Sequence, residues 1–315
     1  MADVRKMTRR LGLALGLAAI ASGLGCKPKR TRVPAICDFD VASDEEIQAQ
    51  SLPPMTWLTL ASPTVDSSTM TRTGELVSAC GQSHESLAGR FECPGFDVAV
   101  PRVRDDRVEA TDLIIDPLGE GKVLLWAATD ELIDGQAEGA AAMALWADGG
   151  LEIHAVGVLR GYRQGARMRL HKLGTIPVLV LESDRCDRRG KCDRIAQVVP
   201  IVERRLLELP VWQEHGCTGR AQFELVRKTE RRLEGSWVRR FVMTRSIELV
   251  DSGILLNDLV VAEDRDMARP DIPARPYMRV VAERPLTVDG ERLVLAGEDL
   301  WSRVLRDDGR VRDEQ

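Results

Sequence analysis

The sequence contains none of the short motifs that usually reveal an enzyme or a cofactor site. It lacks the G-x-S-x-G nucleophile turn, the H-E-x-x-H zinc motif, the calcium-binding EF-hand loop and the phosphate-binding loop. Its four histidines, His84, His154, His171 and His215, are scattered along the chain. Because no motif with a known mechanism is present, the sequence favours a binding or scaffold protein over an enzyme, and we expect no cofactor and no metal.

The chain also lacks a positive net charge and a long apolar run. Its 44 Lys and Arg residues are outnumbered by 49 Asp and Glu residues, which gives a formal net charge of −5. This balance argues against nucleic acid as a partner, because phosphate binding needs a basic surface. No uncharged apolar stretch has the roughly 18 or more residues that predict a membrane-spanning helix.

Sustained helical periodicity is scarce as well, and its best candidate is residues 298–305 near the end of the chain. Instead, short apolar runs recur between Gly, Asp and Pro, and several alternate with polar residues, which predicts strands with one buried face. The runs are 57–60, 96–100, 113–115, 123–126, 151–153, 178–181, 241–243 and 293–295. The predicted fold class is therefore all-β, with antiparallel sheets.

Two stretches of the chain, 122–156 and 177–212, resemble each other. The run 123–126 is matched by 178–181 after 55 residues, and 143–145 is matched by 199–201 after 56 residues. A repeat of this length in an all-β sequence is typical of a propeller blade. A repeated hairpin in a sandwich or a barrel explains the same spacing, so both architectures remain open.

The first 26 residues have the pattern of an export signal. Four basic residues, Arg5, Lys6, Arg9 and Arg10, precede the uncharged run 11–25. This run is too short to span a bilayer, which takes about 20 helical residues, and it ends in small residues. We therefore exclude residues 1–25 from the predicted fold.

The end of this signal, Gly23-Leu24-Gly25-Cys26, resembles the lipobox of bacterial lipoproteins, although Gly23 stands where the family usually has Leu. The resemblance implies that Cys26 is acylated, palmitate being a typical acyl group, and becomes the mature N-terminus. Lys27 follows it, whereas Asp in that position retains such proteins at the inner membrane. The resemblance thus implies an outer-membrane lipoprotein that faces the periplasm or the cell surface. Ordinary cleavage after Ala21 is the alternative.

The mature chain then divides into a tether, 26–55, and a β-rich body, 56–315. Removing residues 1–25 leaves 40 Lys and Arg against 48 Asp and Glu, a net charge of −8. The segment 27–55 is alternatively a strand attached to the body through Cys37. Prolines 270, 273 and 276 predict a long exposed loop over 264–276.

The odd number of cysteines supports acylation of Cys26. Seven cysteines are present, and acylation of Cys26 leaves six for three disulfides in an oxidising compartment. Gly190 supplies a turn that favours pairing Cys186 with Cys192. Cys80 with Cys93 is the next closest pair, which leaves Cys37 with Cys217. The spacings do not match those of a zinc site.

Several charged stretches are candidates for binding. The stretch 227–240 predicts two strands joined at Gly235, and its charges are better explained as protection of a sheet edge than as a ligand site.

The segment 167–171 alternates Arg with apolar residues, which predicts a strand with one basic face. Acidic residues around 258–266 lack the spacing of a calcium loop, so we expect a solvated loop there. The strongest candidates are Arg188, Arg189 and Lys191, on the loop closed by Cys186 and Cys192. A loop closed for stability alone is the alternative, and the disulfide by itself favours it.

The sequence as a whole predicts a lipid-anchored envelope protein that acts as a binding or scaffold module. Its partner would be the membrane through the anchor, together with another envelope protein or an anionic envelope polymer. The alternative function is a secreted hydrolase that acts on cell-wall or polysaccharide substrates with paired carboxylates.

Replacement of the proposed acylation site tests the anchor. Cys26→Ser removes the only thiol in the lipobox-like sequence, so we expect loss of radiolabelled fatty acid and release from the membrane fraction. The matched control is Cys186→Ser, which removes a body cysteine and should leave both properties unchanged. Membrane partitioning that is unaffected by Cys26→Ser would refute the anchor.

Overall fold

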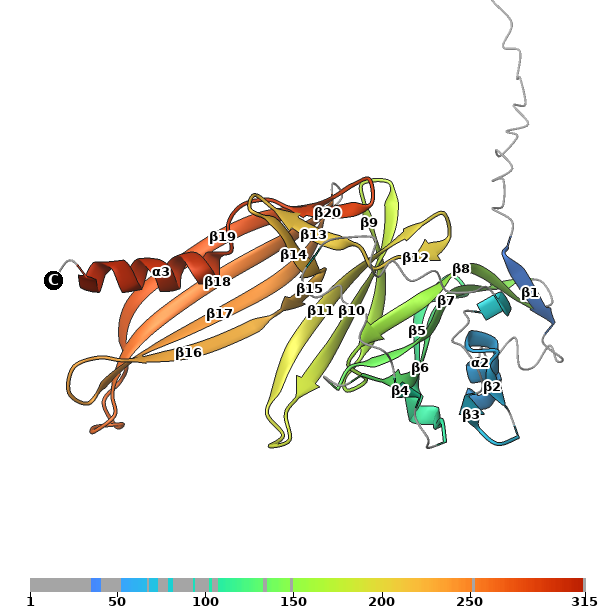
Figure 1. Cartoon of the computed structure of the whole chain (residues 1–315), viewed down its shortest axis with the longest axis horizontal. Helices are drawn as coiled ribbons and strands as arrows, with labels where there is room; N and C mark the ends of the chain where they lie inside the picture. Colours follow the sequence, from blue (N-terminus) through green and yellow to red (C-terminus); the bar gives the residue numbers. More distant parts are fainter. Residues whose placement is uncertain are drawn as a thin grey trace, which may run out of the picture. The chain divides into compact units, whose positions relative to one another are not determined.

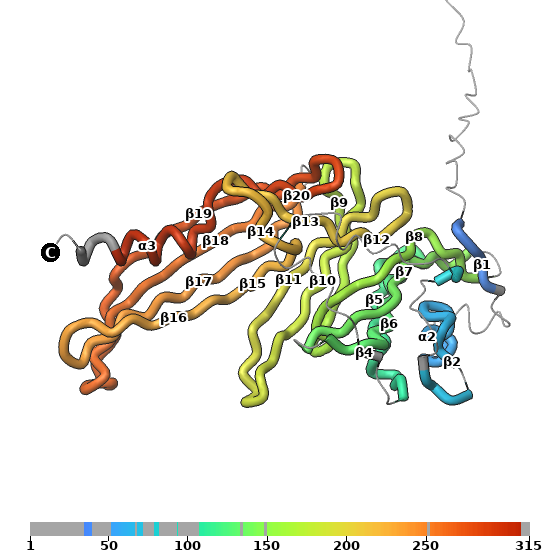
Figure 2. Tube along the Cα trace, viewed as in Figure 1, coloured from blue at the N-terminus to red at the C-terminus, as the bar shows by residue number. Residues whose placement is uncertain are grey.

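The fold was analysed in a computed structural model of the chain, whose elements appear in Figure 1 and whose Cα trace appears in Figure 2. It describes residues 35–40, 52–66, 68–72, 79–81, 93, 102–103, 107–132, 135–147, 150–250 and 253–313. Cys26 and the rest of the signal lie outside the described residues, as does the stretch 82–92 that contains His84. The described residues are mostly in antiparallel strands, as the sequence predicts.

The first sheet has eleven strands and curls into a barrel. Its main order is β4-β6-β7-β8-β12-β11-β10-β9, and β1, β5 and β15 pair with β8, β6 and β11. The strands are β1 (Cys37–Asp40), β4 (Arg102–Val103), β5 (Leu113–Gly119), β6 (Lys122–Glu131), β7 (Ala137–Ala147), β8 (Gly150–Gly161), β9 (Arg167–Leu173), β10 (Ile176–Cys186), β11 (Cys192–Val202), β12 (Arg205–Leu206) and β15 (Gln222–Glu224). The outer strands β5 and β9 meet where the Met168 amide donates to the Asp116 carboxylate at 2.5 Å.

Both faces of β6 are buried, which explains its continuous apolar run. Leu124 and Trp126 point into the barrel core with Leu179 and Leu181. Val123, Leu125 and Ala127 point the opposite way, where α2 (Pro54–Ala61) covers them. A strand that is half-exposed alternates apolar with polar residues, whereas a strand covered on both faces does not.

The α2 helix corrects one expectation, because residues 57–60 were predicted as a strand. A four-residue apolar run does not distinguish a strand from one buried turn of helix. Here Pro54 occupies the first helical turn, where its fixed φ favours a helix and its missing N–H costs nothing. Trp57 and Leu58 are then buried against the first sheet.

The two similar stretches of sequence both form antiparallel hairpins. In the first, β6–β7, Val123 lies opposite Ala144, and in the second, β10–β11, Val178 lies opposite Pro200. The third strands differ. Residues 151–153 belong to the long strand β8, whereas 207–209 belong to no strand. Both hairpins belong to one continuous sheet that is not divided into propeller blades.

The short strand β12 joins the two hairpins into one sheet. It turns back on β11 through Glu203 and Arg204, which both have positive φ, and then lies parallel to β8. This parallel contact is tight, since a Cβ on Gly157 would lie 2.6 Å from the Leu206 Cβ. Only glycine fits at this point of β8.

The second sheet has seven strands in the order β14-β13-β20-β19-β18-β17-β16 and curls into a half-barrel. Its strands are β13 (Pro210–Gln213), β14 (Gly216–Arg220), β16 (Val226–Arg232), β17 (Trp237–Val250), β18 (Gly253–Asp266), β19 (Arg275–Asp289) and β20 (Arg292–Leu295). The helix α3 (Leu300–Asp313) packs on it through Leu300 and Val304. Smaller elements are β2 (Val65–Asp66), β3 (Thr71–Arg72), and the 3-10 helices η1 (Ala79–Gly81) and η2 (Ala110–Asp112).

Three predictions about local structure are confirmed by these elements. Residues 227–240 form β16 and β17 around a turn at Gly235, which has a φ of 65°. In β9, Met168 is buried between exposed Arg167 and Arg169. The helix expected at 298–305 is α3, although it extends to Asp313. No described helix combines the length and the apolar character needed to cross a membrane.

The disulfides are Cys37–Cys80, Cys93–Cys217 and Cys186–Cys192. The last was predicted, but the pairings Cys80–Cys93 and Cys37–Cys217 were wrong. The wrong pairings were predicted from the distance between cysteines along the chain. In the structure β1 pairs with β8, and η1, which carries Cys80, contacts the same strand. Cys37 therefore lies beside Cys80. Of the two predictions for this segment, a tether or a strand attached to the body through Cys37, the strand describes Cys37–Asp40.

A carboxylate with no solvent exposure lies between the long strands of the second sheet. Asp258 on β18 accepts hydrogen bonds from Arg245 on β17, at 2.5 and 3.0 Å, and from Arg284 on β19, at 2.8 and 3.1 Å. Both arginines also approach Asp299, which precedes α3, at 3.2 and 3.5 Å. The expectation of a solvated loop at Asp258 was therefore wrong.

Loss of this carboxylate should destabilise the second sheet strongly. Asp258→Asn leaves two buried guanidinium groups with one fewer anion, and breaking a buried ion pair costs about 3–5 kcal/mol. The control Asp289→Asn breaks an exposed pair with Arg292 and should cost at most about 1 kcal/mol. Urea denaturation measures both, and equal effects of the two variants would contradict the assignment.

Candidate binding groove beside the stapled turn

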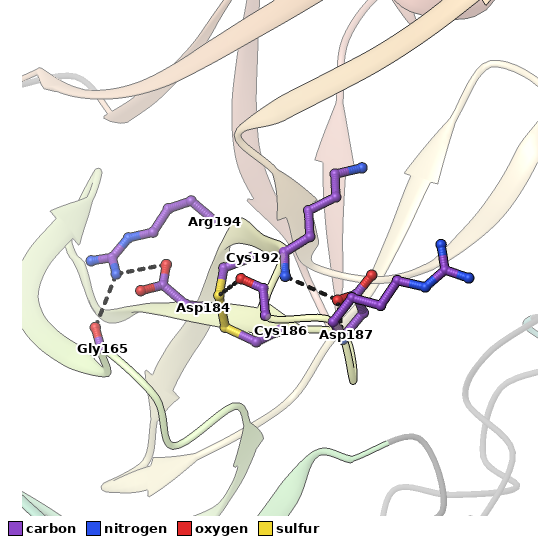
Figure 3. Close-up of a disulfide and its surroundings, with 9 residues drawn as sticks. Gly165, Asp184, Cys186, Asp187, Cys192 and Arg194 are labelled. Atoms are coloured by element: carbon purple, nitrogen blue, oxygen red, sulfur yellow. Dashed lines mark hydrogen bonds and ion pairs between the residues drawn. A yellow bond between two sulfur atoms is a disulfide. The ribbon is translucent and has the colours of Figure 1, made fainter.

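The residues 186–192, here called the stapled turn, connect β10 and β11. The strand register places Cys186 opposite Cys192, where the disulfide closes the turn (Figure 3). Asp187 then fixes the backbone inside it, because its carboxylate accepts from the amides of Arg189 and Lys191 at 2.8 and 2.9 Å. A further backbone hydrogen bond of 2.8 Å joins Asp187 to Lys191. The turn is thus held by both a covalent bond and hydrogen bonds.

The structure brings the three predicted binding residues together on this turn. Arg188, Arg189 and Lys191 are all exposed. Their side chains form no ion pair within the part of the chain that the structure describes. A rigid support for exposed side chains lowers the entropy lost when they bind a partner.

The cations at the base of the turn are paired instead. Arg185 binds Glu224 at 2.6 Å and Asp193 at 3.4 Å, and Arg227 binds the same Glu224 at 2.5 Å. Burial alone would raise the pKa of Glu224, but the hydrogen bonds from Arg185 and Arg227 outweigh it, and the pKa is lowered. Arg194 donates to the Gly165 carbonyl at 3.0 Å and pairs with Asp184 at 3.1 Å (Figure 3). The unneutralised charge therefore lies on the turn itself.

A groove of about 390 Å³ lies next to the turn. Its lining joins the stapled turn, the start of β16 and one side of α3, with an apolar part formed by Val226, Trp301 and Leu305. The remaining lining residues are Arg185, Lys191, Asp193, Glu224, Arg227, Lys228 and Thr229. A partner that contacts the cations can thus also place an apolar side chain against α3.

Ion pairs fix the position of α3 and hence one wall of the groove. Asp308 accepts from Arg231 at 2.7 Å and from Arg239 at 2.6 Å. Asp299 caps the helix by accepting from the Ser302 amide at 3.2 Å. Burial raises the pKa of both carboxyl groups, but the Ser302 hydrogen bonds at Asp299 and the arginine hydrogen bonds at Asp308 lower each pKa below its usual value.

The ion pairs of α3 also explain the basic stretch 227–240. Arg231 on β16 and Arg239 on β17 point to Asp308, and Arg239 also binds Asp264 at 2.7 Å. These two arginines therefore have a structural role, but they hold α3 and do not protect a sheet edge as predicted. The role of α3 in the site is not predictable from the sequence, since nothing local to Trp301 or Leu305 indicates which strands they contact.

Glu138 on β7 and Asp130 on β6 are neighbouring carboxylates. The pKa of Glu138 is raised by burial even though Arg160 lies 2.5 Å away. Glu138 lies opposite Asp130 in the β6–β7 pair, but the two residues are only 4% and 0% exposed, so both are closed to solvent. Among the described residues, no three His, Cys, Asp or Glu side chains cluster in a way that would hold a metal ion.

The histidines that the structure describes are not assembled with a nucleophile. His154 lies 3.0 Å from Glu152, and His171 lies 3.4 Å from the Val250 carbonyl. His215 is exposed in the turn between β13 and β14. The local Ser83-His84-Glu85 sequence lies outside the described residues.

The chain matches no protein-family model, no curated protein and no solved structure. What the groove binds must therefore be inferred from its own residues.

The wall formed by α3 should be sensitive to acid. Because folding lowers the pKa of Asp299 and Asp308, their contribution is present above the unfolded pKa of about 4 and is lost as the pH falls through the lower folded values. We expect the hydrogen-exchange protection factors of α3 to fall in that acidic window before those of β18.

A substitution separates this effect from general acid unfolding. Asp308→Asn should lower the protection of α3 already at neutral pH, because Arg231 and Arg239 lose their shared anion. The neighbouring Asp307 is exposed, so Asp307→Asn is the matched control and should leave protection unchanged. Equal protection in the two variants would show that the ion pairs do not hold α3.

Proposed function

We propose that this protein is a lipid-anchored binding module of the bacterial envelope that captures an anionic partner with the stapled turn and its groove. The observation that carries this proposal is the placement of Arg188, Arg189 and Lys191, exposed and unneutralised on a turn that a disulfide and Asp187 make rigid. The lipobox-like sequence ending at Cys26 supports the envelope location.

The surrounding charges support an anionic rather than a cationic partner. The mature chain is acidic overall, yet at this site Asp193 and Glu224 are paired with Arg185, and on the turn three cations outnumber the single carboxylate of Asp187. What remains for a partner is positive charge from the turn and from the exposed Lys228 at the groove. Positive charge concentrated on an acidic protein attracts anions locally while the rest of the surface repels them.

Capture from the envelope tests the proposal. We expect the full-length lipidated protein to be crosslinked to an acidic partner in membranes, and to bind immobilised polyglutamate with an affinity that falls as salt is added. Replacing Arg188, Arg189 and Lys191 together by Gln should weaken polyglutamate binding about tenfold, since each exposed charge pair contributes about 0.2–1 kcal/mol.

The matched control removes the same charge elsewhere on the surface. Arg167, Lys172 and Arg279 are exposed on β9 and β19, and replacing all three by Gln should leave binding nearly unchanged. A second control, Cys186→Ser with Cys192→Ser, keeps the cations but frees the turn, so a smaller loss is expected. Equal losses in the two Gln triples would mean that net charge alone attracts the anion, which would overturn the proposed site.

A further inference from the structure

The strand β16 forms one edge of the second sheet. It pairs with β17 on one side, and no described strand pairs with its other side. The chain enters β16 directly from the first sheet, because the Leu225 amide donates to the Arg194 carbonyl of β11 at 2.8 Å. Residues 226–229 of β16 then line the groove together with Lys191 and Asp193. An open strand edge therefore borders the binding groove.

The register of β16 shows which of its backbone groups face this open side. The Arg245 amide donates to the Leu225 carbonyl at 2.7 Å, and the Leu233 amide donates to the Trp237 carbonyl at 2.9 Å. In both hydrogen bonds the donor and acceptor residues lie directly opposite each other when the β16–β17 register is continued by one residue at each end. Hydrogen-bonded and non-hydrogen-bonded pairs alternate along an antiparallel ladder, so the odd-numbered residues of β16 bond to β17.

The even-numbered residues consequently direct their N–H and C=O groups to the open side. These residues are Val226, Lys228, Glu230 and Arg232, and the last three have exposed side chains. A row of unpaired donors and acceptors at the spacing of a strand is a template for another strand. Its length, from Val226 to Arg232, allows four such residues to pair.

The charges of this edge favour some strands over others. Lys228 and Arg232 flank Glu230 on the exposed positions, and Lys191 of the stapled turn lines the same groove. A second copy of β16 would bring together two strands that each carry four cations and one anion, and full antiparallel overlap would place Arg227 opposite Arg231, which is destabilising. A strand that carries Glu or Asp places opposite charges there instead. The net positive charge of the edge thus favours an acidic strand over a second copy of β16.

We propose that the edge of β16 binds an extended acidic segment of a protein partner by β-strand addition. The backbone of the segment pairs with the even-numbered residues of β16, its carboxylates meet the cations of the stapled turn, and an apolar side chain enters the groove against Val226, Trp301 and Leu305. This rests on the proposed function and narrows it, because a polysaccharide or phosphate polymer has no alternating amide and carbonyl groups to pair with the edge.

The probe is a capped peptide of sequence Glu-Val-Glu-Thr-Glu-Val-Glu, added to the full-length protein. Strand addition should slow hydrogen exchange at the amides of Lys228, Glu230 and Arg232 by about tenfold or more, as new hydrogen bonds form there. The amides of Arg227, Thr229 and Arg231 already bond to β17 and should change little. Protection spread evenly over odd and even residues, or none at all, would overturn strand addition.

Backbone methylation of the peptide gives a control with unchanged charge. Two isomers are made, each N-methylated on alternate residues, so that one has its free amides on the side that meets β16 and the other has them on the opposite side. One isomer should bind as the parent peptide does, and the other should lose binding. Equal affinity of both isomers would show that the contact is electrostatic only.

Variants of β16 test the same contact from the protein side. Lys228→Pro removes one outward-facing amide at an edge position where proline is tolerated, whereas Lys228→Ala removes only the charge. The proline variant should lose peptide binding and the alanine variant should only weaken it. Equal effects would refute a backbone contact.

The stapled-turn triple variant separates the two proposals. If it weakens peptide binding but no alternating protection appears in the wild-type protein, the anion site stands and strand addition fails. If alternating protection appears but the triple variant binds unchanged, strand addition stands and the role of the turn fails.

Discussion

The buried carboxylate of Asp258 is the constraint on which the geometry of the second sheet depends. It lies on β18, between two long strands, and binds one arginine from each neighbour, Arg245 on β17 and Arg284 on β19. Such an ionic centre contributes little net stability compared with an apolar core, but breaking it is costly, so it specifies one arrangement of the strands. The same arginines reach Asp299, and this connects the centre of the sheet to the start of α3. The wall of the groove is therefore determined far from the groove itself.

The stapled turn differs from the neighbouring strands because arginines on those strands are paired with carboxylates. Arg185 on β10, Arg194 on β11, Arg231 on β16 and Arg239 on β17 are each matched by a carboxylate on a neighbouring element. Paired charges of this kind have a weak field beyond their immediate surroundings. The cations of the turn have no such partners within the described residues, so the field near the groove arises mainly from them and from Lys228. The local positive site on this acidic protein thus arises both from the cations of the turn and from the ion pairs that neutralise the arginines around it.

Much of the fold could be predicted from the sequence because its signals are local. The hairpin closed by Cys186 and Cys192 has a turn residue between two apolar runs, and the alternation in 167–171 directly gives the exposed and buried faces of β9. The failures concern long-range contacts. Residues 57–60 are apolar in both a helix and a strand, and the neighbour that covers them decided the outcome. Asp258 resembles any acidic residue until its strand is placed between Arg245 and Arg284. The open edge of β16 likewise depends on sheet order, which no short stretch of sequence encodes.

The order of the cysteines has a consequence for how the chain becomes oxidised as it emerges N-terminus first. Cys37 and Cys80 are 43 residues apart and are both available before Cys93 appears, so closing this pair removes Cys80 as a competitor. Cys186 and Cys192 follow, separated by only 6 residues, and the hairpin between them brings them together at once. Cys93 alone must wait 124 residues for Cys217. Oxidation in order of emergence therefore yields the native pairs, provided that the thiol of Cys93 stays free until β14 is made. Everything after Cys217, including the edge of β16 and α3, folds without any covalent constraint of its own.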